Sequence, residues 1–279
     1  MCHAANEAVF DLFRSGRLHS STIMTPCPAA HEAVKFASEN PQYAIGVHLT
    51  MTSEWERYRW KPLTGGKSLV DKDGFMWKSS KEVEQNADSA ELEAEIRAQI
   101  VWVRERGLEP SHIDNHMGSL YGHFTGRFGL LKMTLRICGE YGLGYRIFAH
   151  TTREICPRGT PYSVYRLLPV LTRHWAKKYN VIIPDYMLFP DWGEPELKSS
   201  YEHYRQRILQ LWTSIPDGVT ETFIHPSLET DELKGLTHNW RDRVWEYQIV
   251  KDPQTEKYLN DHGVELISYR ELANIKKAR

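Results

Sequence analysis

The stretch that decides the fold is DSAELEAEIRAQIVWVRERGLEPSHIDNH, residues 88–116, because it contains one complete helix-to-strand unit. Asp88 is a typical N-cap residue, Glu91 follows three residues later, and Gly107 is suited to end a helix over 89–106. Apolar residues at helical spacing predict the face that is buried: Leu92, Ile96, Ile100 and Val103. The residues that follow, Ser111 to Asp114, predict a strand that ends beside His116.

Similar alternation extends in both directions along the chain. We expect further strands at Ser20–Met24, Tyr43–Met51, Gly144–Phe148, Val181–Tyr186, Val219–His225 and Val264–Ser268. Helices are predicted between them, at Ala5–Phe13, Pro28–Ser38, Arg127–Tyr141, Tyr162–Tyr179, Ser199–Ser214 and Trp240–His262. Strands that alternate with helices indicate a parallel sheet in an α/β fold. The number of units favours a distorted (β/α) barrel, with an open doubly wound sheet as the alternative, and we treat residues 1–279 as one domain.

Composition excludes several classes of protein. The 35 basic and 36 acidic side chains give a net charge of −1, so no general attraction to nucleic acid or to an anionic membrane is expected. The four cysteines are widely spaced without a C-x-x-C pair, which argues against a disulfide framework or a structural zinc site. No apolar run is long enough to span a membrane and no signal peptide is visible, so we expect a cytoplasmic protein.

Three histidines fall at the carboxyl ends of predicted strands: His48, His116 and His225. In parallel α/β folds active sites assemble at that edge, and neutral imidazole is a common ligand of divalent metals. Asp114, two residues before His116, could ligate a metal or orient a ligand from behind. The alternative is that these histidines are structural, because no H-E-x-x-H or other specific metal motif is present.

An unusually long connection over residues 52–80 is rich in aromatic side chains, including Trp55, Trp60 and Trp77. Long loops are often functional lids, and aromatic faces suit the apolar surfaces of sugar rings. A self-packed loop or a subunit contact is an equal alternative. Arg146, after a predicted strand, could hold an anionic substrate group or form a structural salt bridge. No nucleophile elbow and no complete phosphate-binding loop is present.

Several of these segments together resemble the YdjC-type carbohydrate deacetylases, which include the chito-oligosaccharide (diacetylchitobiose) deacetylases. The resemblance rests on GRLHSSTIMTPCP (16–28), GVHLT (46–50), SLVDKDGF (68–75), EIRAQIVWVRERGLEPSHIDNH (95–116), HP (225–226) and LISYREL (266–272). It implies a distorted barrel that binds a divalent metal, most commonly magnesium with zinc as an alternative, and removes acetyl groups from N-acetylated sugars. It places metal ligands on His48 and His116 and a catalytic histidine, the general acid, on His225.

The sequence departs from the family pattern at its start. Members carry an Ala-Asp-Asp-Phe-Gly segment after their first strand, which supplies an aspartate ligand and a nearby carboxylate. Met1 aligns just after that segment, so we expect the first strand to be missing, through a truncated gene model or a genuine loss. Asp114 is then the nearest remaining carboxylate to act as general base, and the chain as given is expected to be a weak or inactive catalyst.

The implied partner is an N-acetylated sugar or oligosaccharide, with or without a phosphate group. The family and the aromatic residues also suggest a homodimer, and no nucleic-acid or membrane partner is expected. Two other functions stay open: a non-catalytic sugar-binding member of the same family, and another metal-dependent barrel hydrolase such as a phosphoesterase.

Overall fold

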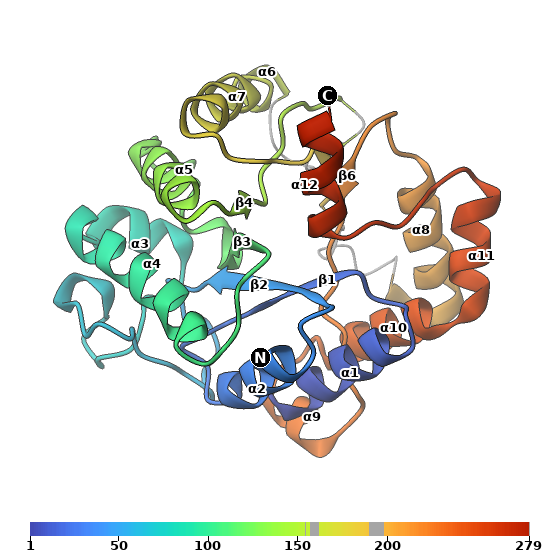
Figure 1. The fold of residues 1–279 in the computed structure, drawn as a ribbon. Coiled ribbons are helices and arrows are strands. Elements are labelled where there is room, and N and C mark those ends of the chain that lie inside the picture. Colours follow the sequence, from blue (N-terminus) through green and yellow to red (C-terminus); the bar gives the residue numbers. More distant parts are fainter. Residues whose placement is uncertain (154, 157–161, 190–197, 279) are drawn as a thin grey trace. The chain divides into compact units, whose positions relative to one another are not determined.

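The computed structural model describes residues 1–278 with gaps at 154, 157–161 and 190–197 (Figure 1). The chain divides into two compact units. The first comprises residues 1–3, 20–146 and 175–182, and the second comprises residues 4–19, 147–174 and 183–279.

The first unit is built on a four-stranded sheet in which all neighbouring strands are parallel. Its strands, in spatial and sequence order, are β1 (Ser20–Ile23), β2 (Ala44–Leu49), β3 (His112–Asn115) and β4 (Gly144–Tyr145) (Figure 1). This arrangement confirms the α/β fold with parallel strands, and the predicted strands at these positions differ only at their ends. Closure of the strands into a barrel stays a prediction.

The contact between β2 and β3 is tight enough to require a glycine. A Cβ atom at Gly46 would lie 2.3 Å from the backbone carbonyl oxygen of His112. That is far inside van der Waals contact, so the two strands could not keep their spacing with any larger residue at this position. Gly46 thereby allows His48 and Asp114, which are direct neighbours in the register, to lie side by side.

Four helices accompany this sheet: α2 (Ala30–Glu39), α3 (Ser80–Asn86), α4 (Ser89–Arg104) and α5 (Gly129–Tyr141). The predicted cap of α4 is confirmed, because Asp88 Oδ1 accepts hydrogen bonds from the backbone N–H groups of Ala90 and Glu91. The predicted apolar face is also confirmed, since all four of its side chains are fully buried. Helix α4 contacts β2 and α5, and it therefore supports the strand that carries His48.

Two buried polar side chains of α4 hold the loop over residues 52–80 and Thr50, which lies between β2 and that loop. Glu95 accepts hydrogen bonds from the backbone N–H groups of Leu63 and Thr64, at 3.0 and 2.9 Å. Gln99 pairs with both backbone groups of Thr50, its Nε2 donating to the carbonyl and its Oε1 accepting from the N–H. The short helix η1 (Lys67–Leu69) lies within this loop. The start of the loop, directly after β2, is thus held in place.

The second unit is mainly helical. It contains α1 (His3–Arg14, from Ala4 onward), α6 (Tyr162–Tyr165), the first part of α7 (Leu168–Tyr179), α8 (Tyr201–Thr213), α9 (Asp231–Leu236), α10 (Trp240–Lys251), α11 (Pro253–Asp261) and α12 (Tyr269–Ala278). Its two short strands, β5 (Tyr186–Met187) and β6 (Thr220–Glu221), pair in parallel. Contacts among α8, α10 and α11 form an apolar core.

Five predictions for this part of the chain were wrong in detail. The helix expected over Tyr162–Tyr179 is divided into α6 and α7, and the strand expected over Val181–Tyr186 is irregular backbone until β5 begins at Tyr186. The expected strand Val264–Ser268 is irregular backbone, and the strand expected over Val219–His225 is reduced to β6. The helix expected over Trp240–His262 is two helices, because Asp252 caps a new helix in which Pro253 is the first residue. In the part of the chain that is described, no helix has both the length and the apolar character needed to cross a membrane.

Candidate functional site

A row of polar side chains crosses the carboxyl end of the first unit's sheet. Thr22 on β1, His48 on β2 and Asp114 on β3 are joined by hydrogen bonds, and Arg146 directly follows β4. Because parallel strands in register present alternate residues to the same face, these four positions share one face of the sheet. The adjacent residues of β2 and β3 that point the other way, Val47 and Ile113, are fully buried.

Asp114 is the centre of this row. Its Oδ1 lies 2.6 Å from His48 Nδ1, and its Oδ2 lies 3.0 Å from Arg146 Nη1. The Thr22 hydroxyl donates to the same Oδ2 at 3.1 Å. The structural salt bridge considered for Arg146 is therefore present, whereas its role in substrate binding stays a prediction. Asp114 contacts His48 Nδ1 and so orients the imidazole. Of the two roles considered for Asp114, metal ligand and orienting residue, this contact corresponds to the second.

The charges of the row follow from burial and from these partners. Burial, the largest influence, lowers the pKa of His48, although the charge of Asp114 acts in the opposite direction. Burial would raise the pKa of Asp114, but Arg146 and His48 together outweigh it and hold that pKa well below its usual range. At neutral pH the pair is thus an ionised carboxylate that accepts from a neutral imidazole, and His48 Nε2 keeps its lone pair.

His116 lies beside His48, as the sequence predicted for the carboxyl ends of neighbouring strands. It follows β3 directly and opens the short helix η2 (His116–Gly118), and the two imidazole centroids are 5.4 Å apart with the rings tilted by 64°. Met117, the next residue, has φ of 53°, a left-handed conformation that is unusual for a residue other than glycine. The chain therefore turns sharply just where His116 leaves the sheet.

Glu54 is the residue at this site that sequence reasoning missed. Its Oε2 lies 2.9 Å from His116 Nε2. Glu54 belongs to the loop over residues 52–80, which has no regular periodicity, so nothing in the sequence pattern placed its carboxylate at the sheet edge. The loop's aromatic residues were the signal that attracted attention instead.

The imidazoles of His48 and His116 are suitable ligands for a divalent cation that binds imidazole nitrogen, such as zinc. Each of the two imidazoles has one ring nitrogen engaged by a carboxylate, which is the usual arrangement behind a metal-binding histidine. Burial favours neutral His48, the form that can bind a metal. Among the described residues, no set of three His, Cys, Asp or Glu side chains with ligand atoms within 4.8 Å of one another includes His48 or His116. The described protein groups therefore supply a pair of candidate ligands.

The tryptophans predicted to bind substrate differ in their surroundings. Trp60 is only 3% exposed, packs against Cys27 and Met76, and donates from Nε1 to the carbonyl of Thr52 at 2.9 Å. It therefore contributes to the packing of the loop, with its ring centroid 6.3 Å from that of His116. Trp77 is partly buried and donates from Nε1 to the carbonyl of Ser68 at 2.8 Å.

Trp55 is partly exposed and lies 6.4 Å from Trp60, measured between ring centroids. Substrate binding by Trp55, Trp60 and Trp77 stays a prediction.

His225 belongs to the second unit, four residues after β6. Its backbone N–H donates to Glu246 Oε2 at 2.5 Å, and Tyr204 donates from its hydroxyl to Glu246 Oε1 at 3.0 Å. Glu246 is buried and fixes the backbone at this point. The catalytic role of His225 stays a prediction.

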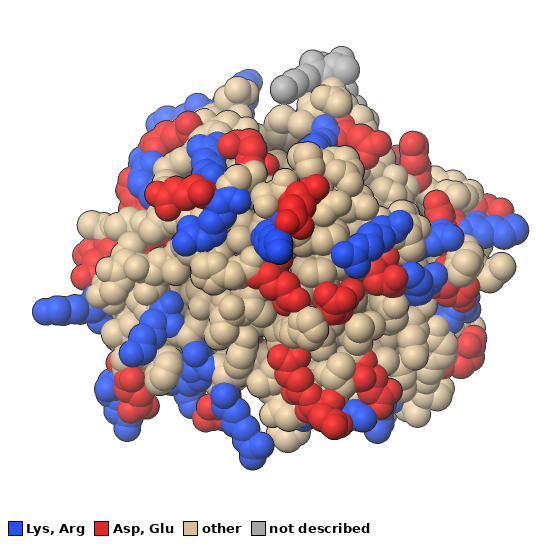
Figure 2. Space-filling view, turned by 60° about the horizontal axis from the view of Figure 1, so that its bottom comes forward, with Lys and Arg blue, Asp and Glu red and all other residues tan. Residues whose placement is uncertain are grey.

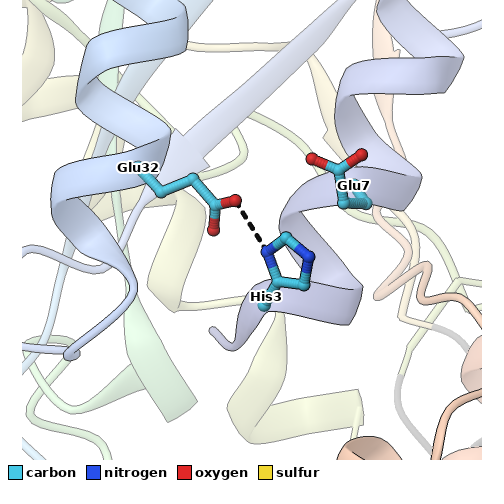
Figure 3. Close-up of side chains that lie close together, drawn as sticks. All are labelled: His3, Glu7 and Glu32. Atoms are coloured by element: carbon cyan, nitrogen blue, oxygen red, sulfur yellow. Dashed lines mark hydrogen bonds and ion pairs between the residues drawn. The ribbon is translucent and has the colours of Figure 1, made fainter.

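A third histidine–carboxylate pair lies on the surface. Figure 3 shows His3, whose Nδ1 is 2.7 Å from Glu32 Oε1. The His3 side chain is 65% exposed, and exposed ion pairs contribute little to stability or binding. Figure 2 shows acidic and basic side chains interspersed on one face of the molecule, in agreement with the net charge of −1.

Comparison with known proteins adds the following. Residues 1–261 match the family described as YdjC-like protein. A carbohydrate deacetylase from Geobacillus stearothermophilus is 26% identical over 269 residues, which cover 95% of this chain and 91% of the relative. Carbohydrate deacetylase 1 from Listeria innocua serovar 6a is 25% identical over 278 residues, which cover 95% of this chain and 92% of the relative.

A solved structure has a similar fold. It is the crystal structure of a putative cellobiose-phosphate cleavage protein from Enterococcus faecalis V583, which is 24% identical, with a TM-score of 0.72. The superposition covers 97% of this chain and 94% of that protein. At this identity the likeness bears on the fold alone.

Proposed function

Because the chain belongs to the YdjC-like protein family, we propose that it is a carbohydrate deacetylase that hydrolyses the acetamido group of an N-acetylated sugar. The observation that carries the proposal is the meeting of His48 and His116, which are far apart in sequence but have ring centroids 5.4 Å apart at one edge of the sheet. Both imidazoles are backed by carboxylates, and an aromatic loop adjoins them. Relatives from Geobacillus stearothermophilus and Listeria innocua bear the name carbohydrate deacetylase.

His48 and His116 would hold a divalent metal. When bound, such a metal supplies Lewis acidity that polarises the acetyl carbonyl and makes the attacking water more acidic. Two imidazoles suit zinc or nickel better than magnesium, which prefers oxygen ligands, whereas family resemblance favours magnesium. The metal is therefore to be identified by titration with each of these ions.

Asp114 and Arg146 would prepare the His48 imidazole for metal binding. Asp114 keeps the Nδ1 proton of His48 and so leaves Nε2 available, and Arg146 keeps Asp114 ionised. Since all three side chains are nearly buried, the row is fixed before substrate arrives. With Asp114 fully engaged in this way, orientation of His48 is favoured over general base catalysis by Asp114.

The substrate class is an N-acetylated sugar or short oligosaccharide of the chito-oligosaccharide type, and the partly exposed Trp55 would stack on a sugar ring. Phosphorylation of the sugar and a homodimer are further parts of the proposal that need direct measurement. General acid catalysis by His225 predicts that His225→Ala lowers kcat while leaving metal affinity unchanged.

The test is release of acetate from N-acetylglucosamine oligomers by the purified chain, with magnesium, zinc or nickel added in turn. We expect His48→Ala and His116→Ala to abolish both metal binding and acetate release, and the exposed control His31→Ala to retain both. Absence of acetate with every metal would refute the deacetylase proposal. Sugar binding without acetate release would identify a non-catalytic member, and phosphate release from a monoester panel would identify a phosphoesterase.

A further inference from the structure

Glu54 is held in place more firmly than its position in a long loop suggests. The two residues before it, Thr52 and Ser53, are fully buried. The Ser53 backbone N–H donates to the carbonyl of Trp77 at 2.8 Å, and the Ser53 hydroxyl oxygen accepts from the Trp60 backbone N–H at 3.1 Å. The Glu54 side chain, 26% exposed, thus extends from a fixed piece of backbone toward His116.

The contact that Glu54 makes repeats, on the neighbouring imidazole, the contact that Asp114 makes with His48. Glu54 Oε2 is 2.9 Å from His116 Nε2, and Asp114 Oδ1 is 2.6 Å from His48 Nδ1. A carboxylate accepts a hydrogen bond and cannot donate one when ionised, so in each pair the contacted ring nitrogen carries the proton. The two carboxylates engage opposite nitrogens of their respective rings.

We propose that Glu54 is a positioning residue that keeps the proton of His116 on Nε2. The lone pair of His116 is then on Nδ1, whereas the lone pair of His48 is on Nε2. The choice of nitrogen decides the direction of each lone pair, and hence the point at which a shared cation is bound. The part of this inference that concerns metal affinity rests on the proposed function, whereas the part that concerns the proton does not.

Glu56, two residues further along the same loop, offers a matched control. Its side chain is 77% exposed and pairs with Lys78 at the surface, 2.7 Å from Oε1 to Nζ.

The first experiment reads the proton directly, in the full chain without added metal. Long-range ¹H–¹⁵N spectra of protein with ¹⁵N-labelled histidine distinguish the two neutral tautomers, and His116→Gln assigns the His116 signals. We expect the Nε2–H form of His116 in the unaltered chain and in Glu56→Gln, and a mixture of both forms in Glu54→Ala. A Nδ1–H form in the unaltered chain, or an unchanged spectrum in Glu54→Ala, would overturn the proposal.

The second experiment measures zinc affinity by calorimetry. Loss of a carboxylate behind a metal-binding histidine lowers affinity by about 10–100-fold, which is the expectation for Glu54→Ala. Glu54→Gln, which keeps the shape and an acceptor oxygen, should lose less, and Glu56→Gln should lose nothing. Equal loss in Glu54→Gln and Glu54→Ala would make Glu54 a direct ligand and contradict a positioning role. If the unaltered chain binds no zinc, nickel or magnesium, the proposed metal site fails, and the tautomer spectra still decide the role of Glu54.

Discussion

Replacement of Asp114 by Asn should destabilise the first unit strongly, because it removes the negative charge at the centre of a buried row. Asp114 and Arg146 have side chains only 4% and 10% exposed, and their charged atoms are 3.0 Å apart. Little solvent can therefore screen the Arg146 cation once its carboxylate is gone. Asn keeps the size of Asp, so a change in packing would not account for the result.

The size of the effect follows from the cost of breaking a buried ion pair from one side, about 3–5 kcal/mol. Removal of both charges should be much less costly, because no isolated charge is then left in the interior. The variant Asp114→Asn/Arg146→Gln is therefore expected to recover most of the stability that Asp114→Asn loses.

Amide hydrogen exchange in β2 and β3 is the appropriate assay, since it reports the opening of this sheet alone. A loss of 3 kcal/mol corresponds to a fall in protection of roughly 150-fold. A fall of less than tenfold in Asp114→Asn, or a double variant as unstable as the sum of the single variants, would refute this account of the row.

Two further predictions concern the rest of the first unit. Ile100→Ala should lower the free energy of unfolding by about 2–5 kcal/mol, because the Ile100 side chain is fully buried on α4. Val101→Ala, at a position 38% exposed, should lower it much less. Urea unfolding measures both variants, and equal losses would contradict the assigned buried face of α4. Hydrogen bonds from Arg97 lower the pKa of Glu93 and of Glu140. The stabilisation that these two ionised carboxylates provide is therefore present above the carboxyl pKa of the unfolded chain, and it is lost as the pH falls through the lower pKa of the folded state. The stability difference between the unaltered chain and Glu93→Gln, measured by urea unfolding from pH 7 to pH 3, should therefore shrink toward the acid end, and a constant difference would argue against the ion pairs.

The elements of the first unit were predicted well because their signals are local. Helix α4 carries its own cap at Asp88 and its own apolar face, so neither depends on distant contacts. The strand expected at Val264–Ser268 failed for the opposite reason. A short apolar segment becomes a strand only when a neighbouring strand pairs with it, and none does so among the described residues.

The candidate site was predictable only in part. The positions of His48 and His116 after apolar runs indicated a shared sheet edge, and the structure brings their rings together. The salt bridge from Asp114 to Arg146 depends on the register of β3 and β4, which the sequence does not specify. Glu54 was missed because a loop of this length can place a side chain in many directions, and only tertiary contacts select one.

The Gly46 contact with His112 has a consequence for how the sheet assembles. If β3 slid past β2 by one residue, Asp114 would turn toward the apolar helices and a different carbonyl would meet Gly46. Such a misaligned chain would leave a carboxylate isolated in the interior, the Arg146 cation without its anion, and the His48 imidazole without its hydrogen-bond acceptor. The residues of the candidate site therefore also select the register of β3 against β2, because a shifted register is destabilised both by the unpaired buried charges and by the steric contact at Gly46.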